Sequence, residues 1–389
     1  MHRKVVIKMV MMKKWYIILC IIFCSVGCQQ GKQQSAVPVF NLDPDSCMNE
    51  LDISGILGDT VEVIKLETTD DCLIGQIDNI RFTDKYIFVS DLYTAQRLYM
   101  FDRYGKFICT IGNRGAGPGE YSVIGEFLVK GDSLLIQDYY QNKYLVYDIV
   151  KRRFMNDIHY KTHHSGAVTL NDNLYFVSSY FKSPLGDYNC FEFNLETGKT
   201  SAYLPFVRSK TVEQSSVALN HPCDYINESK AFAHYFFNDT IYEIDQSGIR
   251  PQCVISFLRN TGGNDYHSIK KEGKIVGLVH LQQSEKYMLG IYTLGNGFRY
   301  FLMDKDALNS MSGELLRIKK LDNKIMLGEF FVQDGYFIFK ETISSLKLWR
   351  TYFYKSKFLN LSDKQKIQDV IDSSKEEDNP IIFRYKLKE

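Results

Sequence analysis

Three short β-rich runs, separated by turn residues, occur twice in succession in the first half of the chain. The first copy reads KYIFVSD, RLYMFD and RYGKFICTIG, and the second reads DSLLIQD, KYLVYD and RRFMND. When the two copies are aligned, Asp91 corresponds to Asp138 and Asp102 to Asp148, at shifts of 47 and 46 residues. Agreement over three successive runs indicates an internal repeat, which constrains the fold more than any other feature of the chain.

The residue that closes the third strand of each repeat, at the end of RLYMFD in the first copy and of KYLVYD in the second, can be followed through the rest of the chain. These landmark residues are Asp102, Asp148, Asn194, Asp245, Asp304 and Lys355. Their spacings of 46, 46, 51, 59 and 51 residues are close to the length of a propeller blade. Short strands cannot bury both faces alone, whereas four-stranded sheets stacked around an axis can. The sequence therefore predicts an all-β fold, a six-bladed β-propeller.

The composition agrees with this prediction. The chain has 26 Tyr and 26 Phe but only eight Pro, a bias that favours strands. Large flat side chains suit the wedge-shaped gaps between blades. The acids in the turns after the third strands are interpreted as structural, because Asp and Asn side chains form hydrogen bonds with the backbone of such turns.

The two ends of the propeller are predicted to meet in one blade. Residues 61–67 (VEVIKLE) and 380–388 both have strand composition and no partner nearby in the sequence. Residues 361–377 break the β pattern and predict a short helical insert before the closing strand, with Ser362 as its cap. The propeller domain is accordingly placed at residues 55–389.

The first 27 residues are predicted to be a lipoprotein signal peptide. Basic residues precede an apolar run of 12 residues from Trp15 to Val26, which is typical of a signal peptide and short for a membrane-spanning helix. The sequence SVGC resembles the lipobox of bacterial lipoproteins, with Ser25 where that motif usually has Leu. This resemblance implies lipidation at Cys28. A plain secretory peptide with an incidental cysteine is the alternative.

Residues 28–54 are predicted to be a flexible tether, because QQGKQQSAVP is polar and rich in turn residues. Cleavage before Cys28 removes five basic residues and no acids, which leaves 42 Lys and Arg against 46 Asp and Glu. A mildly acidic surface without a basic cluster excludes a nucleic-acid partner. The expected partner is a membrane, reached through the lipid anchor.

Six cysteines remain once Cys20 and Cys24 are removed with the signal peptide and Cys28 is lipidated, and none is spaced as C-x-x-C. Exported proteins can form disulfides, and the candidate pair is Cys47 with Cys72. Scattered cysteines are as often small buried apolar residues, and this alternative stays open.

A glycine-rich segment carries a family resemblance. Residues 111–121 (IGNRGAGPGEY) resemble the G-x-G-P-G-E-Y segment of six-bladed β-propeller lipoproteins of Bacteroidetes-type bacteria, which are similar to NHL and TolB-like propellers. The likeness covers roughly residues 55 to 388 and implies no settled reaction. In that group, acidic residues after the lipidated cysteine are associated with surface export, whereas QQGK follows Cys28 in this chain. The expected location is the cell envelope, facing the periplasm.

The same segment could be mistaken for a phosphate-binding loop, but no Gly-Lys-Ser/Thr leads from it into a helix. It is interpreted as a loop between blades whose structural residues are Gly115, Gly117, Pro118 and Gly119. If the loop lies near the central channel, it could line a ligand site. The candidate binding residues are then Arg114, Glu120 and Tyr121.

No catalytic, metal or cofactor site is predicted. His159, His163 and His164 cluster with Asp157, but zinc needs three or four converging ligands, and a solvated loop is the favoured interpretation. The sequence has no G-x-S-x-G nucleophile motif, and its paired acids are adjacent instead of facing across a cleft.

Two classes of function remain. The favoured one is a binding or scaffold module whose loops hold a protein, peptide or glycan. The alternative is a propeller enzyme of the lactonase or lyase kind, with metal ligands that converge on the central channel from several blades. Such a site leaves no local motif.

Overall fold

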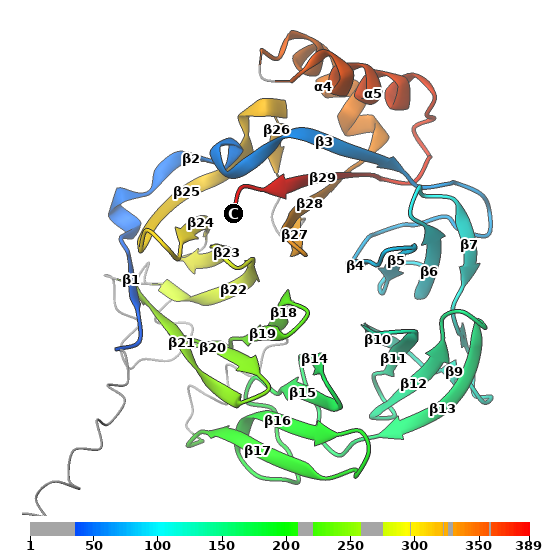
Figure 1. Ribbon diagram of the computed structural model, residues 1–389, viewed down its shortest axis with the longest axis vertical. Helices are drawn as coiled ribbons and strands as arrows, with labels where there is room; N and C mark the ends of the chain where they lie inside the picture. Colours follow the sequence, from blue (N-terminus) through cyan, green and yellow to red (C-terminus); the bar gives the residue numbers. More distant parts are fainter. Residues whose placement is uncertain are drawn as a thin grey trace, which may run out of the picture. The chain divides into compact units, whose positions relative to one another are not determined.

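The computed structural model describes residues 36–208, 221–257, 275–295, 297–321, 323–325, 330–357 and 359–389, and residues 38–389 form one compact unit. In this unit, six antiparallel sheets surround a central channel as the blades of a propeller (Figure 1). The predicted all-β, six-bladed fold is confirmed.

Each blade has four strands, ordered from the channel outward, and β29 (Ile381–Leu387) and β3 (Leu57–Lys65) complete the sixth blade. The inner strands of blades 1 to 6 are β4 (Asn79–Phe82), β10 (Ile124–Lys130), β14 (Gly166–Leu170), β18 (Cys223–Asn227), β22 (Ile275–Gln283) and β27 (Phe330–Gln333). The second strands are β5 (Tyr86–Asp91), β11 (Ser133–Asp138), β15 (Asn173–Val177), β19 (Lys230–Ala233), β23 (Tyr287–Leu294) and β28 (Tyr336–Glu341).

The third strands are β6 (Arg97–Asp102), β12 (Lys143–Asp148), β16 (Tyr188–Asn194), β20 (Thr240–Asp245), β24 (Gly297–Asp304) and β29 (Ile381–Leu387). The outer strands are β7 (Phe107–Thr110), β13 (Arg153–His159), β17 (Thr200–Pro205), β21 (Gly248–Phe257), β25 (Asn309–Ile318) and β3 (Leu57–Lys65). Five of the six landmark residues therefore close third strands, as the repeat predicts.

The landmark acids stabilise the turns that follow them. Asp102 Oδ1 accepts hydrogen bonds from the backbone N–H groups of Tyr104 and Lys106, both at 2.9 Å. Asp245 accepts in the same way from Ser247, at 2.8 Å. These turns lie on the face of the ring at which the third strands end.

The ring closes by pairing the two ends of the compact unit. β29 pairs antiparallel with β3, from Ile381 opposite Lys65 to Tyr385 opposite Val61. The outer strand of blade 6 thus comes from the start of the unit, and the other three come from its end. This is the closure that the sequence predicts for residues 61–67 and 380–388.

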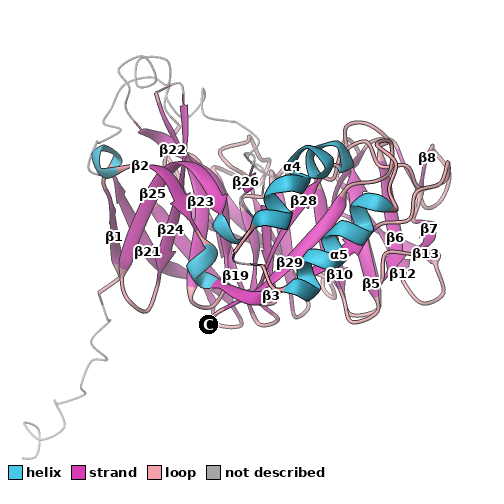
Figure 2. Ribbon diagram, turned by 90° about the horizontal axis from the view of Figure 1, so that it is seen from above, coloured by secondary structure: helices cyan, strands magenta, loops and turns pink. Residues whose placement is uncertain are grey.

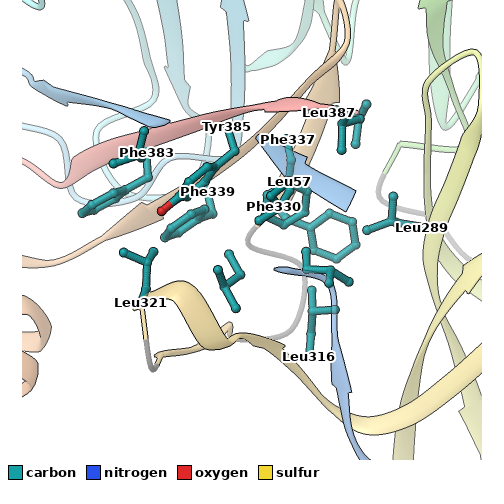
Figure 3. Packing of buried hydrophobic residues seen from close by; sticks show 14 of the residues in the cluster. Leu57, Leu289, Leu316, Leu321, Phe330, Phe337, Phe339, Phe383, Tyr385 and Leu387 are labelled. Atoms are coloured by element: carbon teal, nitrogen blue, oxygen red, sulfur yellow. The ribbon is translucent and has the colours of Figure 1, made fainter. Parts of the chain in front are cut away.

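The closing blade is also held by aromatic packing (Figure 3). The rings of Phe339 and Phe383 are stacked with centroids 4.9 Å apart, and those of Phe330 and Phe337 are stacked at 5.7 Å. All four side chains are almost fully buried between blades 5 and 6. One such apolar cluster fills each of the six blade-to-blade interfaces in the described chain.

Residues 39–52, assigned above to the flexible tether, form two strands instead. β1 (Val39–Leu42) pairs parallel with β21, and β2 (Met48–Asp52) pairs parallel with β25. The outer edges of blades 4 and 5 offer unpaired backbone groups, and these two strands satisfy them.

The other small strands are β26 (Asn323–Ile325), β8 (Asn113–Arg114) and β9 (Glu120–Tyr121), and the short 3₁₀ turns are η1 (Pro44–Ser46), η2 (Ser54–Ile56) and η3 (Lys319–Leu321).

Two helices, not one, precede the closing strand and lie outside blade 6 (Figure 2). The landmark at Lys355 is wrong, because this residue lies in α4 (Ile343–Lys355). The sequence TYFY suggests a strand, but Ile343, Leu346 and Phe353 are the buried side chains, and this spacing is helical.

The second helix, α5 (Leu361–Asp372), is shorter than the predicted insert at residues 361–377. Asn360, not Ser362, is its cap, and the Asn360 side chain accepts the N–H of Asp363 at 2.8 Å. The buried carboxylate of Asp363 in turn accepts the N–H of Val61 on β3 at 3.1 Å. The helix is therefore attached to the closing blade.

Two further predictions can be compared with the structure. Cys47 and Cys72 are both free thiols, so the candidate disulfide does not form, and Cys72 donates to the carbonyl of Glu67 at 3.1 Å. The signal peptide and Cys28 lie outside the described residues. No helix of the described part of the chain is long and apolar enough to cross a membrane.

Deleting residues 380–389 removes β29 and should destabilise the protein by more than about 5 kcal/mol, because several buried side chains are lost together. It also leaves β28 and β3 without their shared partner, so we expect aggregation or a much lower melting temperature. Thermal melts monitored by circular dichroism measure this. A chain that lacks only the exposed Glu389 is the control. If the long truncation melts with the full chain, the ring is not closed by its C-terminus.

Candidate functional site

A cavity of about 390 Å³ lies at the end of the channel where the inner strands begin. Its walls are the starts of β4, β10, β14 and β18, together with the loops that follow β5 and β11. This face is opposite the turns that the landmark acids stabilise, because successive strands of a blade run in opposite directions. We call this cavity the channel-mouth pocket.

Two buried aspartates of the repeat position the pocket loops. Asp91 Oδ1 accepts the N–H of Thr94 at 2.8 Å, and its Oδ2 accepts the N–H of Gly75, also at 2.8 Å. Asp138 accepts the N–H of Ser122 at 3.0 Å and its hydroxyl at 2.5 Å. Both carboxylates are fully buried. Asp91 joins the loop after β5 to the segment before β4, and Asp138 holds the segment before β10 at the end of β11.

These loops carry exposed tyrosines at the pocket. Tyr93 and Tyr140 are 73% and 71% exposed, and Tyr139 is 38% exposed. The rings of Tyr139 and Tyr140 meet edge to face, with centroids 5.5 Å apart. Rigid amphipathic rings that line a cavity while exposed to solvent form a surface for ligand contact.

An ion pair crosses the channel below the pocket. Arg81 on β4 pairs with Asp224 on β18, in the opposite blade, and both side chains are buried. Burial opposes the charge on Arg81, but Asp224 together with Tyr225 and Asp334 outweighs it, and the guanidinium pKa is raised. Gln282 on β22 donates to the second oxygen of Asp224 at 3.2 Å. The charges at the floor therefore neutralise one another.

Histidines from two more segments lie beside this pair. His221 lines the pocket, and its ring centroid is 6.1 Å from that of His280 on β22. Burial lowers the pKa of His221, and it lowers that of His280 to about 3. Both rings are therefore neutral near pH 7.

A hydrogen-bonded group forms the wall between blades 2 and 3. Glu126 Oε1 accepts from Tyr144 at 2.6 Å and lies 3.1 Å from His164 Nε2. Glu126 Oε2 accepts the N–H of Ala167 at 2.9 Å. Burial, with the adjacent Glu126, raises the pKa of Tyr144, so its hydroxyl keeps its proton. The Gln137 amide nitrogen lies 3.0 Å from His164 Nε2.

Three buried polar atoms of the pocket lining have no hydrogen-bond partner among the described residues. They are His164 Nδ1, Ser165 Oγ and Gln96 Oε1. His164 is only 3% exposed, and its contacts with Gln137, Tyr144 and Glu126 are all made by Nε2. Buried polar atoms normally have partners, and these three are enclosed by protein atoms, so a ligand or water reaches them only when a side chain of the pocket wall moves.

The predicted ligand loop lies elsewhere. β8 and β9 pair parallel, with Arg114 opposite Tyr121. Tyr121 is 1% exposed and donates to the carbonyl of Gln96 at 3.0 Å, whereas Arg114 is exposed. The loop contacts outer strand β13 through Gly119 and Phe154, and none of its candidate residues lines the channel-mouth pocket. Ligand binding by this loop stays a prediction.

The loop residues interpreted as structural make a compact turn. Gly117 donates to Glu120 Oε2 at 2.7 Å, and a Cβ atom at Gly115 would lie 2.0 Å from that oxygen. Gly119 has a φ of +77°, which L side chains rarely adopt, and its carbonyl accepts from Tyr147. Pro118 lies between these two glycines.

The histidine cluster separates in the structure. His159 and His163 are exposed, and Asp157 lies 3.4 Å from Lys143. His164 is buried in the pocket wall, so the solvated-loop interpretation is wrong for this residue. No group of three or more potential metal-ligating residues converges within the described residues.

The sequence analysis missed the pocket residues, although the repeat contains a signal for some of them. Tyr139 and Tyr140 directly follow Asp138, and Tyr93 stands two positions after Asp91. Aromatic residues at equivalent loop positions of two adjacent repeats could have identified this face. Nothing local identifies His164, which reaches Glu126 only through the packing of two blades.

Comparisons with known proteins agree with the fold. The family described as Domain of unknown function (DUF4934) matches residues 37–386. A candidate exported protein of Bacteroides fragilis is similar at a TM-score of 0.68 and 21% identity, over 90% of this chain and 100% of that one. A DUF4221 family member from Bacteroides vulgatus is similar at a TM-score of 0.50 and 10% identity, over 86% and 97%. No curated protein matches. The structural likenesses show a shared fold.

Replacing Gly119 with Val should destabilise the protein by about 1 to 3 kcal/mol. The new Cβ would lie 2.8 Å from that of Phe154, in a backbone conformation that favours glycine. Gly198→Val is the matched control, since Gly198 has a φ of +68° and open space around it. Chemical denaturation measures both. Equal losses would mean that Phe154 does not confine the loop, and no loss at either site would contradict both arguments.

Proposed function

The chain belongs to the DUF4934 family, and we propose that it is an exported, lipid-anchored binding module whose ligand occupies the channel-mouth pocket. The observation that carries the proposal is the pocket itself. It combines exposed tyrosine rings at its edge with buried polar atoms that lack partners among the described residues. Concave sites with a few convergent polar groups are the usual places for ligands on a rigid scaffold.

The arrangement favours binding over the alternative, a metal-dependent lactonase or lyase. That enzyme would need ligands from several blades on the channel axis. Arg81 and Asp224 meet there and pair with each other, and a guanidinium beside a would-be metal site repels a cation. The wall carboxylate, Glu126, is held by Tyr144 and the N–H of Ala167.

Export and anchoring are supported by the signal-peptide pattern and by the resemblance of residues 111–121 to Bacteroidetes propeller lipoproteins. The similar protein from Bacteroides fragilis is itself a candidate exported protein. The likeness to NHL and TolB-like propellers and the periplasmic orientation are parts of the same proposal.

The start of β1 and the channel-mouth pocket lie on opposite faces of the ring. β21 starts on the face opposite the pocket, and β1 runs parallel to it, from Val39 opposite Val254 to Leu42 opposite Phe257. The chain therefore enters blade 4 from the side of that opposite face.

Ligand-induced stabilisation tests the pocket. A library of soluble oligosaccharides, short peptides and small metabolites is screened by thermal melts, because a ligand that binds only the folded state raises the melting temperature. We expect stabilisation of wild type to be lost in Tyr140→Ala. It should be kept in Tyr104→Ala, a control with a tyrosine that is 81% exposed on the opposite face. If every stabilising compound acts equally on both variants, the pocket is not the binding site.

Replacing Cys28 with Ser should release the protein from the membrane fraction and abolish incorporation of labelled fatty acid. Cys24→Ser is the control, because Cys24 precedes the expected cleavage site and should not matter. Fractionation and labelling in cells measure both. A Cys28→Ser variant that stays with membranes, together with an unlabelled wild type, would show that there is no lipid anchor at this cysteine.

A further inference from the structure

The charged groups in and below the channel-mouth pocket are already satisfied within the protein. Arg81 is paired with Asp224, and Glu126 is held by Tyr144, His164 and a backbone N–H. The remaining acid of the lining, Asp78, accepts the N–H of Leu92 at 2.6 Å and the Gln76 amide at 2.6 Å. Among the described residues, the pocket thus presents no free cation to an anionic ligand.

An anionic ligand would also meet repulsion. The carboxylates of Asp78 and Glu126 both belong to the lining. Burial raises the pKa of Asp78, and the nearby Asp91 acts in the same direction. Since the negative charge of the Asp78 carboxylate is already disfavoured here, an additional negative charge from a ligand is disfavoured too.

The groups that lack partners among the described residues are an amide oxygen, a hydroxyl and an imidazole nitrogen, and they are of mixed hydrogen-bonding type. Gln96 Oε1 can only accept, Ser165 Oγ can donate and accept, and His164 Nδ1 does one or the other according to its tautomer. A ligand that satisfies all three must carry several groups that both donate and accept. Hydroxyl groups do this, and a sugar ring carries several of them close together.

The tyrosines supply the other half of such a site. Tyr93, Tyr139 and Tyr140 expose ring surface next to the polar wall. Sugar rings have faces of C–H groups that pack on aromatic rings, with hydroxyls around their edges. The cavity volume of about 390 Å³ is at the lower end of the range for ligand pockets. A cavity of this size fits a short segment of a polymer, not a folded partner protein.

We propose that the ligand of the channel-mouth pocket is a neutral glycan. Its sugar rings pack on the exposed tyrosines, and its hydroxyls bind His164 Nδ1, Ser165 Oγ and Gln96 Oε1 when the side chains of the pocket wall move to admit them. This inference rests on the function proposed above and adds the chemical class of the ligand.

Isothermal titration calorimetry on the mature protein tests the class. The probes are neutral glucan, xylan and mannan oligosaccharides, an oligogalacturonate of equal length as the anionic counterpart, and a lysine-rich peptide. We expect at least one neutral oligosaccharide to bind and the oligogalacturonate not to bind. If only the oligogalacturonate or only the peptide binds, the neutral-glycan proposal is wrong. If Tyr140→Ala weakens that binding, the channel-mouth pocket is still the binding site.

Three variants locate the bound sugar. Tyr140→Ala should weaken binding by about tenfold or more. Ser165→Ala should weaken it by about threefold to tenfold, with an unchanged melting temperature, because the hydroxyl has no partner among the described residues. Tyr104→Ala should have no effect. The inference fails if no neutral oligosaccharide binds, or if the one that binds does so equally well to all three variants.

Discussion

The pairing of β29 with β3 is the interaction on which the rest of the structure depends. It joins residues more than 300 positions apart and completes the sixth blade, so that the first and last segments of the compact unit are held in one sheet. The helices α4 and α5 are attached to this same blade, through Asp363 on Val61 and through the buried cluster of blades 5 and 6. Closure sets the spacing of every blade around the channel.

The ring then determines where the repeat places its loops. The same aspartate positions that end the second strands, Asp91 and Asp138, hold two neighbouring loops beside the channel, and those loops carry the exposed tyrosines. Only in a closed ring can Arg81 reach Asp224 in the opposite blade. Fold and candidate site are therefore two results of one arrangement.

The repeat makes the fold predictable, because an Asp or Asn closes the third strand in five of the six blades of the described chain. The sixth landmark at Lys355 is wrong. Its aromatic neighbours favour a strand locally, but the segment forms a helix that buries Leu346 and Phe353 on one side. The tether prediction is wrong for residues 39–52, because β1 and β2 gain their stability from blade edges that the local sequence does not reveal.

The candidate site is less predictable. The family-like loop with Arg114 and Glu120 is conspicuous in the sequence but packs near the outer strands of blade 2, away from the channel-mouth pocket. His164 stands next to an exposed histidine, which favours a solvated loop, and only the packing of blades 2 and 3 brings it to Glu126. The most direct measurement is a crystal structure of the protein with a bound neutral oligosaccharide. We expect sugar rings on Tyr139 and Tyr140 with a hydroxyl at His164 Nδ1, and a sugar bound outside the channel-mouth pocket would contradict the account.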